Sequence, residues 1–161
     1  MTTFTGAISS LTAGTTTLST PVNNHRDALK AVSEAWTAYT PTATNFTVGD
    51  GTLSGRYARI DKLIHIRISF VAGAATTYTA SGMTLTLPVA AHGSLEQALH
   101  LKLFTGSVVY VGNAFPTVST TTCSLYVPAA AADCRLSIMS TATPNPGTTG
   151  NFQIQGTYEA A

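Results

Sequence analysis

Charged side chains are scarce in this chain of 161 residues. Asp, Glu, Lys and Arg together make up 9% of it, whereas a typical soluble domain carries about 25%. Eight basic and seven acidic residues leave a formal net charge of +1, and nucleic-acid-binding proteins normally show a concentrated basic stripe. Asp61 interrupts the one basic cluster, which comprises Arg56, Arg59, Lys62 and Arg67. We therefore expect no nucleic-acid partner.

Long apolar runs and a cysteine framework are also missing. Nothing approaches the ~20 apolar residues of a membrane span, and the first residues lack the basic start and apolar core of a secretory signal. The two cysteines, Cys123 and Cys134, are eleven positions apart. Two half-buried thiols on neighbouring strands and a disulfide across a hairpin are both open interpretations. No His lies at ligand spacing from either cysteine, so we expect no metal. The lack of a long apolar run leads us to expect no membrane partner.

Motifs that carry catalysis are absent as well. There is no P-loop, no G-x-G-x-x-G and no G-x-S-x-G sequence, and the four histidines form no H-x-x-x-H pair. A glycosidase needs two facing carboxylates, but the seven acidic residues are separated in sequence. A glycosidase site is therefore possible only if the fold brings two of them together. We predict a structural or binding protein and not an enzyme, with no catalytic residue and no cofactor.

Threonine is abundant where charge is not, at about one residue in six. It is β-branched and suits a pleated, half-exposed strand. From residue 52 onward apolar residues recur with a period of two, most clearly in Leu63–Phe70. Further strands are expected around 83–87, 95–103, 108–111, 124–127, 134–139 and 152–158. This spacing predicts a mostly β protein, with an antiparallel β-sandwich or jelly roll over residues 52–161.

Three segments are expected before this β domain. Residues 1–19 are small, Thr-rich and uncharged, which predicts an extended arm that is either disordered or ordered against a partner. A helix is expected over 20–36, with Thr20 as its N-cap and Pro21 at its first position. Residues 37–51 are rich in Thr, Pro and Gly and predict a linker that ends in a turn.

One stripe of the expected helix is apolar, apart from a histidine. Its spacing leaves two interpretations open, packing on the chain's own sheet or a short multi-helix bundle around a symmetry axis. In a bundle, copies of the histidine would meet near the axis and set the number of subunits. The expected oligomer interface consists of Val22, His25, Leu29, Val32 and Trp36.

Four segments carry a resemblance to a known family. Residues 36–41 read W-T-A-Y-T-P, residues 49–62 read G-D-G-T-L-S-G-R-Y-A-R-I-D-K, residues 85–89 read L-T-L-P-V, and residues 156–161 read G-T-Y-E-A-A. They resemble the W-x-x-Y-T-P, G-N-G-T-x-x-G-R-Y-x-x-x-G-K, S-L-P-V and G-x-Y-E-x patterns of small virion proteins from bacteriophages that infect actinobacteria. The chain departs from these patterns at Asp61, where glycine is common before the lysine.

The resemblance implies a homo-oligomer, commonly a trimer, on the exterior of a virion assembled in the host cytoplasm, without catalytic residues. One implied role is a capsid decoration or minor capsid protein that docks onto the major capsid protein through its arm. The other is a minor tail or tail-fibre protein that binds a host cell-surface glycan. The short chain favours decoration. The arm's apolar anchors are Phe4, Ile8, Leu11 and Leu18.

A receptor-binding protein would place its informative residues in loops far from the arm. The aromatic candidates for such loops are Tyr78, Tyr110, Phe115 and Tyr126. Ordinary packing in the core or an interface is the alternative role for each of them.

Overall fold

Antiparallel pairing organises the strands in the part of the chain that the computed structural model describes, which is residues 36–93, 96–129 and 135–161. The all-β antiparallel class expected from the period of two is confirmed. The strands are β1 (Thr37–Tyr39), β2 (Ala43–Thr44), β3 (Phe46–Thr47), β4 (Thr52–Ile60), β5 (Leu63–Val71), β6 (Thr77–Tyr78), β7 (Thr84–Thr86), β8 (Leu99–Phe104), β9 (Val109–Pro116), β10 (Thr122–Pro128), β11 (Leu136–Ile138) and β12 (Asn151–Glu159).

Two of the expected segments fall mainly outside this part of the chain. The arm at 1–19 lies wholly outside the described residues, and so does the helix at 20–36 except for Trp36, which belongs to no regular element. Within the described ranges there is no helix of the length and apolarity that a membrane crossing requires.

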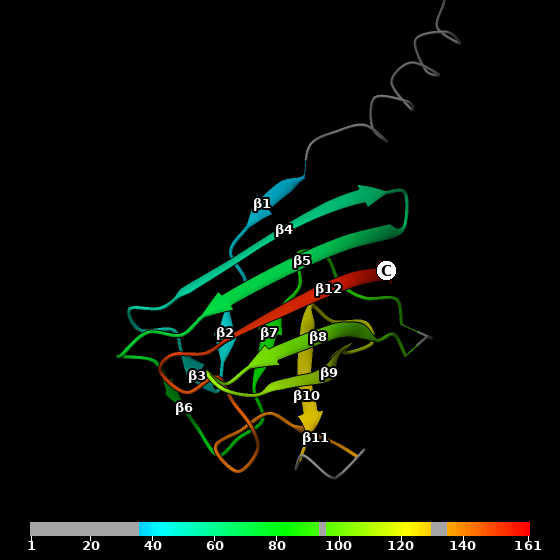
Figure 1. The fold of residues 1–161 in the computed structure, drawn as a ribbon. Coiled ribbons are helices and arrows are strands. Elements are labelled where there is room, and N and C mark those ends of the chain that lie inside the picture. The colour runs from blue at the N-terminus through cyan, green and yellow to red at the C-terminus, as the bar shows by residue number, and fades with distance from the viewer. Residues whose placement is uncertain (1–35, 94–95, 130–134) are drawn as a thin grey trace, which may run out of the picture. The chain divides into compact units, whose positions relative to one another are not determined.

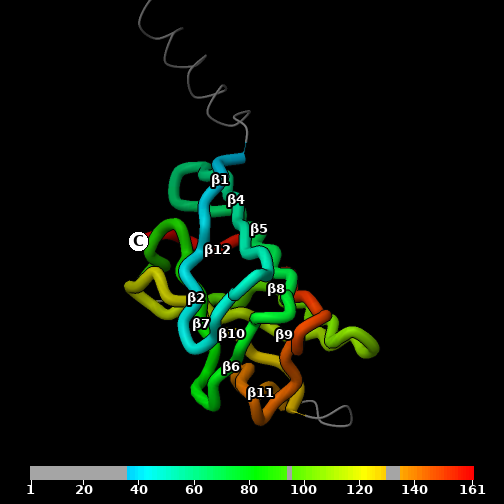
Figure 2. The backbone as a smooth tube through the Cα atoms, turned by 90° about the vertical axis from the view of Figure 1, so that its left-hand side faces the viewer, coloured from blue at the N-terminus to red at the C-terminus, as the bar shows by residue number. Residues whose placement is uncertain are grey.

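Ten strands form one strongly curled sheet in the order β1-β4-β5-β12-β8-β9-β10-β7-β2, with β11 paired to β10. In Figure 1 the strands β4, β5 and β12 run diagonally, whereas β7 and β10 cross that direction at a steep angle. Figure 2 shows β1 at one end of the domain and β6 and β11 at the other. A single continuous sheet therefore supplies both walls around the core, where the sequence predicted a sandwich or jelly roll.

The β4–β5 hairpin forms where the alternation predicts it. Ile60 pairs with Leu63 across a two-residue turn, in which Asp61 adopts a φ of 54°. Aspartate tolerates this left-handed conformation, so the departure from the glycine of the family pattern leaves the hairpin intact. The apolar face of β5 is at most 2% exposed and consists of Ile64, Ile66, Ile68 and Phe70.

Three segments differ from the sequence expectations. The strand expected over 95–103 begins at Leu99, because the Gln97 side chain instead bonds both backbone groups of Glu159. β9 extends beyond the expected 108–111 because Asn113 and the residues up to Pro116 pair with β10. Residues 37–51, expected as a linker, contribute β1, β2 and β3 and belong to the same compact unit as the later strands.

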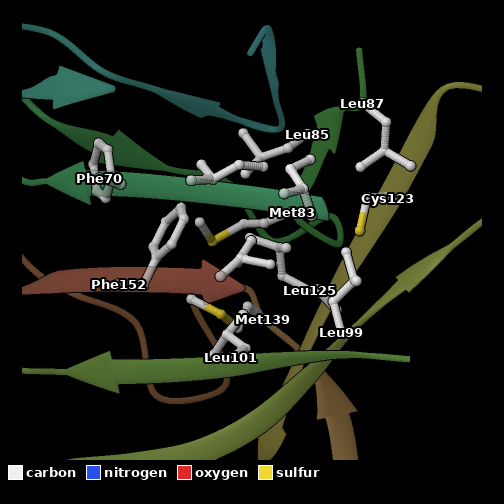
Figure 3. Close-up of a cluster of buried hydrophobic side chains, with 14 of the residues drawn as sticks. Phe70, Met83, Leu85, Leu87, Leu99, Leu101, Cys123, Leu125, Met139 and Phe152 are labelled. Atoms are coloured by element: carbon white, nitrogen blue, oxygen red, sulfur yellow. The ribbon is translucent and has the colours of Figure 1, made fainter. Parts of the chain in front are cut away.

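The core fills the inside of the curl, and Figure 3 shows apolar side chains from β5, β7, β8, β10 and β12 directed into it. Phe70 and Phe152 meet with ring centroids 4.9 Å apart, and Phe46 of the small β3–β6 sheet lies edge-on to Phe70 at 5.4 Å. Burial of each such side chain stabilises the fold by roughly 1.5–3 kcal/mol. Cys123 is fully buried as a free thiol, whereas Cys134 lies outside the described residues.

Candidate binding surface on the outer face of the sheet

Trp36 lies on the outer face of the sheet, just before β1, beside two arginines from neighbouring strands. Arg56 of β4 is paired directly with Arg67 of β5. The Cζ atom of Arg56 lies 5.4 Å from the centroid of the Trp36 ring, and that of Arg67 lies 5.6 Å from it. Because like charges directly opposite on a sheet repel, the two cation–π contacts offset a repulsion within the sheet.

The inner face of the same segment is fixed by packing. Tyr39 pairs with Gly55, and a Cβ atom on Gly55 would lie 2.4 Å from Cε1 of the Tyr39 ring. The ring also meets Tyr57 edge-on, with centroids 5.9 Å apart. Burial raises the pKa of the Tyr39 hydroxyl well above its usual 10.0, so the neutral phenol is the form that packs here. Strand β1 is therefore held on both of its faces.

Two adjoining depressions lie on the outer face and share Arg67 and Gln155. The first has a volume of about 470 Å³ and lies over β4, β5 and β12. The second has a volume of about 390 Å³ and is bordered by Trp36. Apolar residues contribute to the lining of both depressions, and no Asp or Glu does. The polar groups that line them are cationic, amide, hydroxyl or imidazole groups, and include Ser54, Arg56, His65, Ser69, His100, Gln153 and Thr157.

Hydrogen bonding orders part of this surface. Nδ1 of His65 and Oγ1 of Thr157 lie 2.9 Å apart across the paired strands β5 and β12. Arg59, which points away from the depressions at the end of the hairpin, donates from Nε to the Asp61 carbonyl oxygen at 2.7 Å. The surface thus has two arginines that lie against the Trp36 ring and make no side-chain hydrogen bond or ion pair with a described residue.

The four aromatic candidates lie in strands and do not gather in one place. Tyr78 stacks on Phe46 in the small sheet, and its hydroxyl donates to the Gly147 carbonyl oxygen at 2.8 Å. Tyr110 packs against the core. Phe115 and Tyr126 do meet, with ring centroids 5.3 Å apart, beside a third depression of about 380 Å³. Each of the four belongs to a strand, so they do not occupy loop tips, and the packing role left open from the sequence is the one that the structure shows.

Most other site residues expected from the sequence fall outside the described part of the chain. Trp36 alone can be placed, and it contacts arginines of its own sheet. The residues that cannot be placed are Phe4, Ile8, Leu11, Leu18, Val22, His25, Leu29 and Val32.

Sequence reasoning noticed the basic cluster but missed its geometry. Once the turn is placed at 61–62, Arg56 and Arg67 stand at equal distances from it along the two arms of the hairpin. Antiparallel pairing then requires them to face one another. That register was the signal that could have identified the arginine pair.

The turn motif at residues 49–51 has a structural role. Oδ1 of Asp50 accepts a hydrogen bond from the Ala75 backbone N–H at 2.8 Å, and Oγ1 of Thr76 donates to the Val48 carbonyl oxygen at 2.8 Å. These bonds join the loop before β4 to the loop after β5. In the described part of the chain, no group of three His, Cys, Asp or Glu side chains is arranged to hold a metal ion.

The other family-like segments meet near the C-terminus. The Tyr158 hydroxyl donates to the Val89 carbonyl oxygen at 2.9 Å. The backbone N–H of Ala160 donates to the Lys62 carbonyl oxygen at 2.7 Å, and that of Ala161 donates to the Ala90 carbonyl oxygen at 3.0 Å. Parts of the 49–62, 85–89 and 156–161 segments, with Ala90, therefore form one hydrogen-bonded junction.

Comparisons of the chain with protein-family models, with curated proteins and with solved structures found no match.

Proposed function

We propose that the chain is a structural protein of a bacteriophage virion, and specifically an oligomeric capsid decoration protein. The observation that supports this is where the family-like residues lie. Trp36 and Tyr39 pack against Arg56, Gly55 and Tyr57, and the remaining segments meet at the C-terminal junction. These residues therefore hold the fold together. Related virion proteins that have no catalytic centre would share residues with this structural role.

The proposed mechanism is adhesion by repeated weak contacts. Residues 1–19 lie against the major capsid protein, and the helix expected from residue 20 onward, which does not include Trp36, joins copies of the chain into a trimer on the virion exterior. Several arms on one oligomer then raise the strength of attachment above that of a single arm. The β domain projects from the shell, and we interpret its curled sheet as a variant of the sandwich or jelly roll that the strand spacing predicts.

Cryo-electron microscopy of the intact virion tests the location. We expect density for the β domain on the capsid, with residues 1–19 ordered against the shell. Density only at the tail tip would contradict decoration and would favour the tail-fibre role with a host-surface glycan as ligand.

Native mass spectrometry of the purified chain tests the oligomer. We expect a trimer, and a changed subunit number in His25→Leu, because a polar residue near the axis of a bundle specifies the number of helices. An unchanged subunit number in the variant would contradict the role of His25 in setting the number of subunits.

A further inference from the structure

The Arg56–Arg67 pair lacks a counter-charge among the described residues. The two residues are paired directly across β4 and β5, and both guanidiniums lie against the Trp36 ring. The acidic residues of the described part are Asp50, Asp61, Glu96 and Glu159, and none of them lines either adjoining depression. An anion bound between the guanidiniums would relieve their repulsion, and the planar arginine fork suits carboxylate and phosphate oxygens.

The surroundings of the pair favour a ligand with many hydroxyl groups. Two serines and two glutamines line the first depression, and they offer donors and acceptors without further charge. These are Ser54, Ser69, Gln153 and Gln155. The depression holds about 470 Å³, which is within the ~300–1,000 Å³ of known small-ligand sites. The second depression continues past Arg67 to Trp36, which is 40% exposed and adds an apolar surface.

An extended peptide fits this surface poorly. Peptides often bind sheets by adding a strand at a free edge. β5 is paired with β4 on one side and with β12 on the other along its whole length, so its backbone groups are already used. A ligand over β5 must be held by side chains alone.

From these observations we infer that the outer face around Arg56, Arg67 and Trp36 binds an anionic oligosaccharide. The carboxylate or phosphate of the sugar lies between the two guanidiniums, and its hydroxyl groups bond the serine and glutamine side chains. This site goes beyond the proposed decoration function, and it does not depend on whether the protein lies on the capsid or the tail.

Fluorescence titration of the full chain tests the site directly, because Trp36 is the only tryptophan. The probes are trigalacturonate for the carboxylate, a glycerol phosphate oligomer for the phosphate, and uncharged galactotriose, each at low ionic strength. We expect a saturable change with at least one anionic probe and none with galactotriose. The two anionic probes distinguish a uronate from a phosphate-bearing glycan. Equal binding of galactotriose would overturn the role of the arginine pair.

Charge-matched variants separate the site from general attraction. The double variant Arg56→Gln/Arg67→Gln should weaken binding about tenfold or more, since two charge-assisted contacts are lost. The control Arg59→Gln/Lys62→Gln removes the same charge outside both depressions and should bind as the parent chain does. Calorimetric titration supplies the affinities, and circular dichroism shows that both variants fold. Equal loss in the two variants, or no binding by the parent chain, would overturn the inference.

An acidic peptide serves as the competing ligand. A hexaglutamate peptide should bind more weakly than the better anionic sugar, because it cannot use the hydroxyl-directed side chains. Tighter binding of the peptide would indicate an acidic protein partner in place of the oligosaccharide and would contradict the proposal.

Discussion

β5 carries two different surfaces on one strand. Ile64, Ile66, Ile68 and Phe70 face the core, and His65, Arg67 and Ser69 alternate with them on the outer face. The inner set is fixed by packing, where size and apolarity decide the free energy of unfolding. The outer set has no such constraint, so its arginine, imidazole and hydroxyl groups are available for recognition. Substitutions on the two faces should therefore affect different properties.

The largest expected effect is at the centre of the inner face. Phe70→Ala removes a ring that contacts Phe46 and Phe152 and should lower the free energy of unfolding by about 3–5 kcal/mol. The neighbouring outer-face variant Ser69→Ala should change it by less than about 0.5 kcal/mol. Urea denaturation measures both. Similar losses in the two variants would show that the faces are not energetically distinct.

A smaller loss is expected on the inner face of the sheet where β1 pairs with β4. Gly55→Ala places a methyl group against the Tyr39 ring, and the resulting strain should cost about 1–3 kcal/mol. In the double variant Tyr39→Ala/Gly55→Ala the ring is gone, so the added methyl group no longer clashes with it. The double variant should therefore lose less unfolding free energy than the two single variants lose when their losses are added. Strictly additive losses would show that the contact between the Tyr39 ring and Gly55 does not restrict which residue can stand at position 55.

The inner face was largely predictable from the sequence, because alternation records which residues are buried. Alternation over Ile64 to Phe70, Met83 to Leu87 and Phe152 to Tyr158 located β5, β7 and β12, although β7 itself covers only Thr84–Thr86. The curl of the sheet was not predictable, since the pairing of β12 between β5 and β8 joins segments far apart in the chain. The arginine pair was missed for a related reason, because it depends on register and not on composition.

A third expected effect, on pH dependence, concerns the thiol in the core. Burial raises the pKa of Cys123 from 9.0 to about 12. As the pH rises above 9, the unfolded chain loses this proton while the folded chain keeps it, so stability falls with a slope approaching about 1.4 kcal/mol per pH unit. Burial likewise raises the pKa of Tyr158, from 10.0 to about 12, so its effect begins at higher pH.

Between pH 9 and 10 the unfolded chain also begins to lose protons from Tyr39, Tyr78 and Tyr158, because burial raises the pKa of each of them in the folded chain. A variant is therefore needed to separate the thiol from the tyrosines. Cys123→Ala should make the decline of the unfolding free energy in that interval less steep, as measured by urea denaturation at each pH, and the decline that remains belongs to the tyrosines. Cys134→Ala is the matched control and should keep the decline. A flattened profile in the control and a steep one in Cys123→Ala would assign the effect to the other cysteine.

The smallest expected effects lie on the outer face, where two opposing interactions meet at Arg56. Its contact with Trp36 is favourable, and its position opposite Arg67 is unfavourable. Double-variant cycles should give a coupling of about 0.5–1 kcal/mol for the Trp36–Arg56 pair. The Arg56–Arg67 pair should give a coupling of opposite sign and of about 0.2–1 kcal/mol.

Salt distinguishes the repulsion from packing. The repulsion between the guanidiniums should nearly vanish at about 1 M salt, where the screening length is about 3 Å. The van der Waals packing of the arginine side chains on the indole should persist, so part of the Trp36 coupling should remain. A favourable Arg56–Arg67 coupling at low salt would mean that a counter-charge already lies between them. In that case a charged group of the chain itself would occupy the place that we assign to a ligand. The outer face would then differ from the inner face in composition, but it would not be available to a ligand.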